Sequence, residues 1–96
     1  MRPEDAAEIR ITSRVADKIW QKHGVTEEEV IELLESEDPP AQVRRSHRAA
    51  GSYIALGRTA AGRLLLVAFF PQRDGSVNVA TARDMTQAER RLYERS

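Results

Sequence analysis

The sequence predicts an α+β fold in which helices pack on an antiparallel sheet. Two capping boxes of the form T-x-x-E, at 26–29 and 86–89, predict the starts of two helices. Between them, apolar segments separated by turn residues at 59–62 and 71–75 predict a three-stranded antiparallel meander. The expected order is therefore a short N-terminal strand, two helices, the meander and a C-terminal helix.

The N-terminal part predicts one strand and two helices. Residues 8–12 (EIRIT) alternate between apolar and polar side chains, which is typical of a strand. Ser13 is expected to cap a first helix that ends at His23, with Gly24 as its left-handed C-terminal cap. The second helix begins at the first capping box and ends before two prolines at 39–40. The inner face of the first helix is expected to consist of Val15, Ala16, Ile19 and Trp20.

The C-terminal part predicts a loop, three strands and a helix. Residues 39–51 have no clear period and are expected to form a basic loop. The strands of the meander are expected at 52–57, 63–70 and 77–83. The middle strand is so apolar that we expect it to be covered on both faces. The last helix is expected to begin near residue 84 or 86, with Met85, Ala88, Leu92 and Tyr93 on its inner face.

Length and composition limit the class of protein. Ninety-six residues predict one domain over 1–96. The absence of cysteine excludes disulfides and thiolate metal sites. The N-terminus is charged, which argues against a signal peptide, and the longest apolar run, 64–70, is too short to span a bilayer. A cytoplasmic location is therefore expected.

Charge is distributed unevenly although the net charge is zero. Residues 1–38 carry eleven acids and five bases, whereas residues 39–96 carry four acids and ten bases, all of them arginine. Arginine suits two-pronged contacts with phosphate or carboxylate groups, so this half is expected to bind anions. The alternative is a solvated arginine face with no ligand.

Four segments carry a resemblance to a known family: 22–30 (KHGVTEEEV), 57–58 (GR), 62–67 (GRLLLV) and 81–93 (TARDMTQAERRLY). They resemble the BrnT family of bacterial type II toxin–antitoxin systems. The resemblance implies a RelE-like ribonuclease fold, an endoribonuclease toxin acting on RNA, and a small antitoxin partner of the ribbon-helix-helix type. The alternative is a non-catalytic RNA-binding or protein-interaction domain of the same fold.

Such a ribonuclease lets a ribose 2′-oxygen attack the adjacent phosphorus. It needs a proton acceptor, positive charge at the phosphoryl oxygens and a proton donor for the leaving oxygen. Arg83 is the first candidate because it lies just before a helix N-terminus, where anions are stabilised. The alternative for Arg83 is an ion pair with Asp84 or Glu89. The full set of candidate catalytic residues is Arg83, Arg63, Glu89 and Tyr93.

Further basic residues are candidates for RNA contact: Arg58, Arg90, His23, Lys22, Arg45, His47 and Arg48. The segment 44–48 (RRSHR) has the composition most suited to phosphate. Each candidate has a structural alternative, such as a solvated loop for 44–48 and a helix C-terminal charge for His23. Two histidines 24 residues apart, without recurrent carboxylate spacing, predict no metal site. No cofactor is expected, since no glycine-rich phosphate-binding loop is present.

Overall fold

The structure, a computed structural model, describes residues 8–95. Its elements are β1 (Ile9–Arg10), α1 (Ser13–His23), α2 (Glu27–Glu35), β2 (Gln42–Arg45), β3 (Tyr53–Arg58), β4 (Leu64–Pro71), β5 (Val77–Asp84) and α3 (Gln87–Glu94). This order confirms the predicted α+β class, with a strand, two helices, the meander and a last helix. It adds one strand, β2, that the sequence did not predict.

The five strands form one mixed sheet in the order β1-β5-β4-β3-β2. The meander β3–β4–β5 is antiparallel as predicted, and β1 joins its edge in parallel to β5. The prediction of a basic loop over 39–51 was wrong in part, because Gln42–Arg45 pairs antiparallel with β3. β2 has only four residues and two adjacent arginines, so it gains its order from hydrogen bonds to β3 and not from a local pattern.

Helix starts and ends follow mostly local signals. Both predicted capping boxes are present, at Thr26 and Thr86. Gly24 has φ 62° and ends α1 in the left-handed conformation, as predicted. The first cap is Thr12 and not Ser13: the Thr12 hydroxyl accepts from the Val15 amide at 3.2 Å. Thr12 stays extended, so its side chain turns back onto that amide, whereas Ser13 is already helical.

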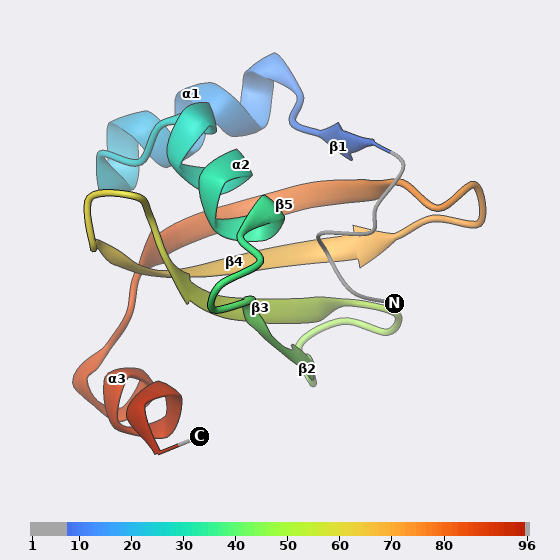
Figure 1. Cartoon of the computed structure of the whole chain (residues 1–96). Helices are drawn as coiled ribbons and strands as arrows, with labels where there is room; N and C mark the ends of the chain where they lie inside the picture. The colour runs from blue at the N-terminus through green and yellow to red at the C-terminus, as the bar shows by residue number, and fades with distance from the viewer. Residues whose placement is uncertain (1–7, 96) are drawn as a thin grey trace.

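The main core lies between the sheet and the two N-terminal helices (Figure 1). Ile19 of α1, Leu33 and Leu34 of α2, and Val67 and Phe69 of β4 are buried there. Each such side chain contributes roughly 1.5–3 kcal/mol through the area it removes from water. Trp20, expected to lie in this core, is 60% exposed on the outer side of α1.

Gly57 permits the close packing of α2 on β3. A Cβ at this position would lie 2.9 Å from the Leu33 Cγ, closer than carbon atoms approach in proteins. Any larger residue would therefore push α2 away from the sheet.

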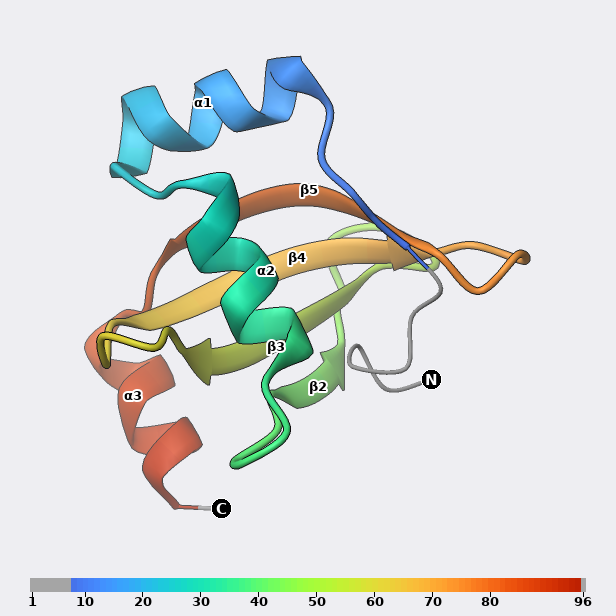
Figure 2. The same ribbon diagram turned by 45° about the horizontal axis from the view of Figure 1, so that its top comes forward.

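The opposite face of the sheet is covered only at one end, by α3 (Figures 1 and 2). Tyr93 packs there against a small cluster of Leu56, Leu66 and Met85. The prediction that β4 is covered along both faces is therefore wrong for its C-terminal half. Ala88 and Leu92, expected to face inward, are exposed because the eight-residue α3 packs on the sheet mainly through Tyr93, beside Met85, which precedes the helix. We call the uncovered part the open face.

Candidate functional site

A groove of about 360 Å³ lies on the open face. Its floor consists of Ile54, Leu66, Ala68, Phe70, Ala80 and Thr81, from the three central strands. One rim is formed by Arg45, the last residue of β2, and by His47 and Arg48 of the connection to β3. The other rim is formed by Arg83 and Glu89, at the junction of β5 and α3. The structure thus brings five of the predicted site residues to one groove.

A β-bulge in β5 shapes the floor. Ala68 pairs with Thr81, but Phe69 pairs with Val79, so Ala80 is an extra residue in β5. The bulge changes the alternation of the strand: Val79 and the later Ala82 both face the core, and the two small residues between them line the groove. Without the bulge, one of these two residues would point into the core.

Arg83 is fixed by a two-pronged contact with Glu89. Its Nη1 donates to the Glu89 Oε1 at 2.7 Å, and its Nη2 donates to Oε2 at 2.9 Å. Glu89 also accepts from the Thr86 backbone amide as part of the capping box. The Arg83 hydrogen bonds are the largest cause that lowers the pKa of Glu89 from 4.5 to about 2. Glu89 is therefore ionised near neutral pH and is a weak base, which argues against a catalytic role for this candidate as the proton acceptor.

The loop of the other rim is ordered by its own hydrogen bonds. The Ser46 amide donates to the Ser52 carbonyl at 2.9 Å, and the Ser52 hydroxyl donates to the Ala49 carbonyl at 2.8 Å. Ser52 is buried, whereas His47 and Arg48 are exposed beside the groove. The loop therefore presents an imidazole and a guanidinium to solvent from a fixed base.

Arg63 lies elsewhere, in a structural cluster. Its Nε and Nη2 donate to the two Asp84 oxygens at 2.9 and 3.1 Å. Its Nη1 donates to the Gly24 carbonyl at 2.8 Å and to Glu29 at 3.2 Å, and its Nη2 donates to the His23 carbonyl at 2.9 Å. Arg63 thus joins the ends of α1, α2 and β5, and each of its three nitrogens is engaged.

Three other candidates lie away from the groove. Lys22 and His23 are in the last turn of α1, and Arg90 is exposed on α3. The Arg63 hydrogen bond chiefly lowers the pKa of Asp84, and the charges of Arg90 and His23 add to this effect. The charges of Arg90 and His23 therefore act on the Asp84 carboxylate and not on the groove.

Tyr93 does not line the groove either. Its ring packs on the cluster that holds α3 against the sheet. Its backbone carbonyl accepts a hydrogen bond from the Gln42 Nε2 at 2.9 Å, which ties α3 to β2. These contacts favour the half-buried packing role over the catalytic one.

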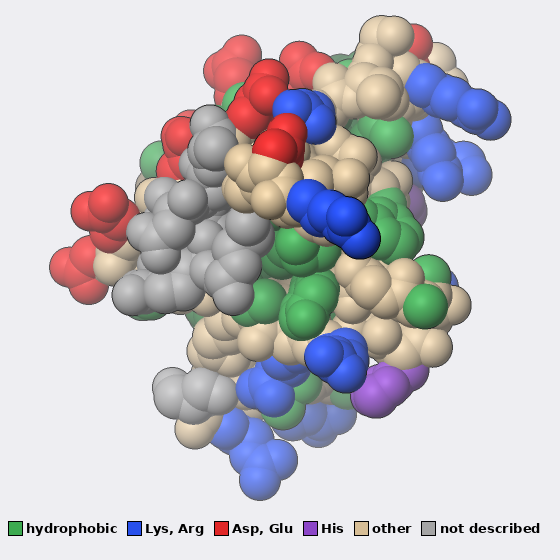
Figure 3. Space-filling view, turned by 90° about the vertical axis from the view of Figure 1, so that its right-hand side faces the viewer, with side chains coloured by type: hydrophobic (Ala, Val, Ile, Leu, Met, Phe, Trp, Pro, Cys, Tyr) green, Lys and Arg blue, Asp and Glu red, His purple; other side chains and the backbone are tan. Residues whose placement is uncertain are grey.

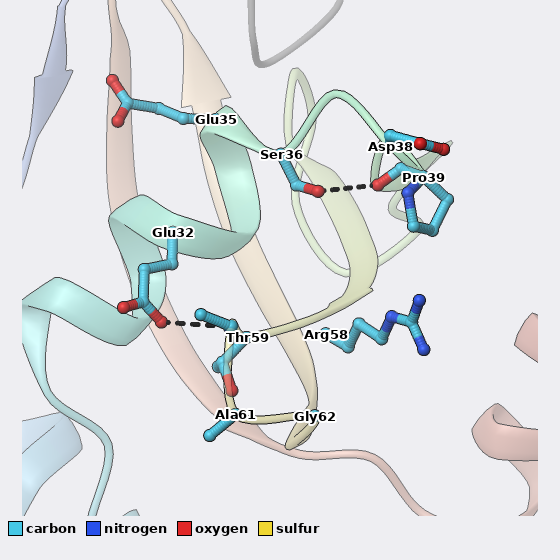
Figure 4. Close-up of a pocket in the computed structure, with 10 residues that line it drawn as sticks. Glu32, Glu35, Ser36, Asp38, Pro39, Arg58, Thr59, Ala61 and Gly62 are labelled. Atoms are coloured by element: carbon cyan, nitrogen blue, oxygen red, sulfur yellow. Dashed lines mark hydrogen bonds between the residues drawn. The ribbon is translucent and has the colours of Figure 1, made fainter.

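Arg58 lines a different cavity, of about 590 Å³ (Figure 4). Glu32, Glu35 and Asp38 line it too, so its charge is mainly negative. Glu32 accepts from the Ala60 amide at 3.2 Å, and Arg58 points away from Glu32 and Glu35 (Figure 4). An acidic cavity repels phosphate, so this arrangement does not favour Arg58 as an RNA contact.

Charge is also distributed unevenly over the surface. On the face drawn in Figure 3, acidic side chains gather in the upper and left parts. Basic side chains lie at the upper right, in the middle and in the lower part, where histidine is also visible. Hydrophobic side chains are visible between these regions. Among residues 8–95, no group of three or more His, Cys, Asp or Glu is placed to hold a metal ion. No helix in this described part is long and apolar enough to cross a membrane.

The groove contains residues that the sequence reasoning did not single out. Phe70, Ala80 and Thr81 belong to its floor. Arg44 pairs with Ile54 and so shares the open face at its edge, since paired residues on neighbouring strands point to the same side. The one local signal for the bulge was the break in alternation at 77–82, where apolar residues recur after two and then three positions.

Comparisons with known proteins identify a solved structure with a similar fold. No family model matches the chain, and no curated protein matches it. Among solved structures, the Brucella abortus ribonuclease toxin BrnT matches with a TM-score of 0.65 and 20% sequence identity. The match covers 83% of this chain and 97% of that one. The α+β, RelE-like architecture that the sequence resemblance implied is therefore confirmed, and the chain has the fold of the BrnT ribonuclease toxin.

Proposed function

We propose that this protein is a metal-independent endoribonuclease toxin of a type II toxin–antitoxin pair, and that the groove on the open face is its RNA site. The observation that carries the proposal is the placement of the Arg83 guanidinium on one rim of the groove, opposite the basic segment 45–48 on the other rim. A likeness to a ribonuclease toxin of the same fold supports the same reading.

In the proposed reaction, a ribose 2′-oxygen attacks the adjacent phosphorus. The O2′–P bond forms and the P–O5′ bond breaks, which leaves a 2′,3′-cyclic phosphate on one product and a 5′-hydroxyl on the other. The 2′-hydroxyl loses a proton, and the departing 5′-oxygen gains one. The protein must therefore supply positive charge and a route for protons.

Arg83 supplies the charge in this proposal. Glu89 holds its guanidinium by two hydrogen bonds, so it does not need to reorganise as negative charge develops on the phosphoryl oxygens. Its side chain is 31% exposed, which leaves it open to a phosphate from the groove side. Glu89 thus positions Arg83 and does not move a proton.

His47 is the proposed proton carrier. An imidazole can both accept and donate a proton, and His47 is exposed on the rim opposite Arg83. Arg48 follows it on the same rim and adds positive charge near the RNA backbone. Arg63 and Tyr93 are assigned to the scaffold, because their contacts hold elements together outside the groove.

The experiment is cleavage of a labelled RNA by the purified protein in the presence of a chelator. We expect cleavage with 5′-hydroxyl products, reduced strongly in Arg83→Ala and in His47→Ala. Arg14→Ala is the matched control, because Arg14 is exposed on α1, which covers the other face of the sheet. Cleavage that vanishes with chelator and returns with magnesium contradicts the metal-independent mechanism. RNA binding without cleavage favours the non-catalytic alternative.

The toxin part of the proposal concerns a protein partner. We expect a small antitoxin of the ribbon-helix-helix type to bind the protein and suppress cleavage. Expression of the protein alone in a bacterial host is expected to stop growth, and co-expression of the antitoxin is expected to restore it. Unchanged growth with intact RNA would contradict a toxin role.

A further inference from the structure

We propose that the groove seats one unpaired RNA base, flat against Phe70 and the bulge of β5, so that single-stranded RNA is the substrate class. This inference rests on the proposed function and specifies what the same site accepts. It follows from three features: an apolar floor, a recess made by small residues, and positive charge confined to the rims.

The floor is chemically suited to the face of a base. Phe70 is partly exposed on it, together with Ala68 and Ile54, and the buried Leu66 lies beneath. A phosphate placed on such a floor would lose its water without gaining a partner. A base has an apolar face that stacks on aromatic side chains in many single-strand-binding proteins.

The bulge makes the recess. Ala80 and Thr81 are consecutive residues that both line the groove, which an uninterrupted strand would not allow. Both are small, so space is left above them beside Phe70. A volume of about 360 Å³ is at the lower end of the range for ligand pockets, roughly 300–1,000 Å³, and suits a small planar group.

The charges are placed where the phosphates of one nucleotide would leave the groove. Arg83 lies on one rim and Arg48 on the other, while the floor residues are uncharged. A base in the groove can therefore have its flanking phosphates at both rims. In an RNA duplex the bases are stacked inside the helix and do not offer their faces, so duplex RNA lacks the group that fits the floor.

The test measures binding of uncleavable RNA to the full-length protein. A short fluorescent RNA with 2′-O-methyl groups, which cannot attack phosphorus, is compared with the same strand annealed to its complement. We expect the single strand to bind at least about tenfold more tightly, because stacking on one aromatic residue alone is worth roughly that factor. Equal affinity for both RNAs would overturn the inference.

Variants of the floor sharpen the test. Phe70→Ala is expected to weaken single-strand binding roughly 5- to 100-fold, and Phe70→Tyr is expected to retain it. Ala80→Leu is expected to fill the recess and weaken binding, while Ala60→Leu in the exposed β3–β4 turn is the control. Thermal midpoints are compared for all four proteins. If the Ala80→Leu and Phe70→Ala proteins are folded and bind single-stranded RNA as tightly as the parent protein, no base binds on this floor and the inference is wrong.

The outcome is separable from the proposed nuclease activity. If unmodified RNA is not cleaved but the single-strand preference and floor effects persist, the groove binds a base and the ribonuclease proposal fails. If single-stranded and duplex RNA are both cleaved, the ribonuclease proposal stands, and the inference that the groove binds an unpaired base fails.

Discussion

Arg63 and Arg83 each form a two-pronged contact with a carboxylate near the end of β5, but their surroundings differ. Arg63 contacts two carboxylates and two backbone carbonyls that come from three elements. Arg83 contacts Glu89 and the neighbouring Asp84 carbonyl, and it lines a groove. The comparison shows what separates a structural arginine from a candidate site arginine. The difference is how many of its hydrogen-bond donors already have partners within the protein.

Loss of Arg83 should have the largest effect on activity. We expect Arg83→Ala to lower RNA cleavage about 100-fold, since one lost charge-stabilising contact costs about 2–4 kcal/mol of barrier. The protein should stay folded, with a thermal midpoint lower by roughly 10 °C, because the variant loses the ion pair with Glu89. Cleavage rates and midpoints of both proteins check this. Full activity would exclude Arg83 from the site, and a collapsed midpoint would make it scaffold like Arg63.

Loss of Arg63 should appear mainly in stability. We expect Arg63→Ala to lower the free energy of unfolding by about 2–3 kcal/mol, because it leaves charged and carbonyl acceptors without their shared donor. Denaturant titration measures this change. Arg63→Lys is the matched variant: it keeps the charge but cannot form the fork, so it should recover only part of the stability. If Arg63→Ala remains fully stable but inactive, Arg63 belongs to the site and the comparison fails.

The Arg83–Glu89 pair should make stability depend on pH. The pKa of Glu89 is lowered from 4.5 to about 2, so its contribution is present above about pH 4.5 and is lost as pH falls toward 2. Glu89→Gln retains the capping geometry but removes the charge. We expect its free energy of unfolding near neutral pH to be lower than that of the parent protein by on the order of 2 kcal/mol. This difference between the two proteins should decrease below about pH 4.5. A gap that stays constant from neutral to acidic pH would contradict the ion pair.

Salt should produce the smallest graded effect. With roughly three to five phosphate contacts to single-stranded RNA, the slope of log K against log salt should be about −2 to −3.5. Replacing Arg44, Arg45 and Arg48 with Gln should make it shallower, whereas replacing Glu27 and Glu28 on α2 should change it little. A slope near zero for the parent protein would leave the basic rim without a role in RNA binding.

Local signals predicted most of the fold. The capping boxes at Thr26 and Thr86, Gly24 and the two turns of the meander each depend on residues a few positions apart, and each is present. The strand β2 and the extent to which other elements cover β4 depend on pairing and packing between segments that are distant in the sequence. A local sequence pattern carries no information about such contacts. The predictions failed where tertiary contacts decide the outcome.

The candidate site was only partly predictable for the same reason. Composition singled out Arg45, His47 and Arg48, the position before a helix singled out Arg83, and the structure brings the four residues to one groove. It did not separate them from Arg63, whose partners lie 21 to 40 positions away along the chain. The residue type indicates which ligand a side chain could bind. The number of its hydrogen-bond partners in the folded protein indicates whether it is still free to bind that ligand.

Glu29 has a consequence for how the molecule opens. Its carboxylate closes the capping box of α2 by accepting from the Thr26 amide at 3.0 Å, and it also accepts from Arg63. The first turn of α2 therefore cannot fray without releasing an anchor that also holds the end of α1 and the start of β4. This corner should behave as one cooperative unit, and the amide hydrogens of the first turn of α2 should exchange with solvent at the rate of those around Arg63.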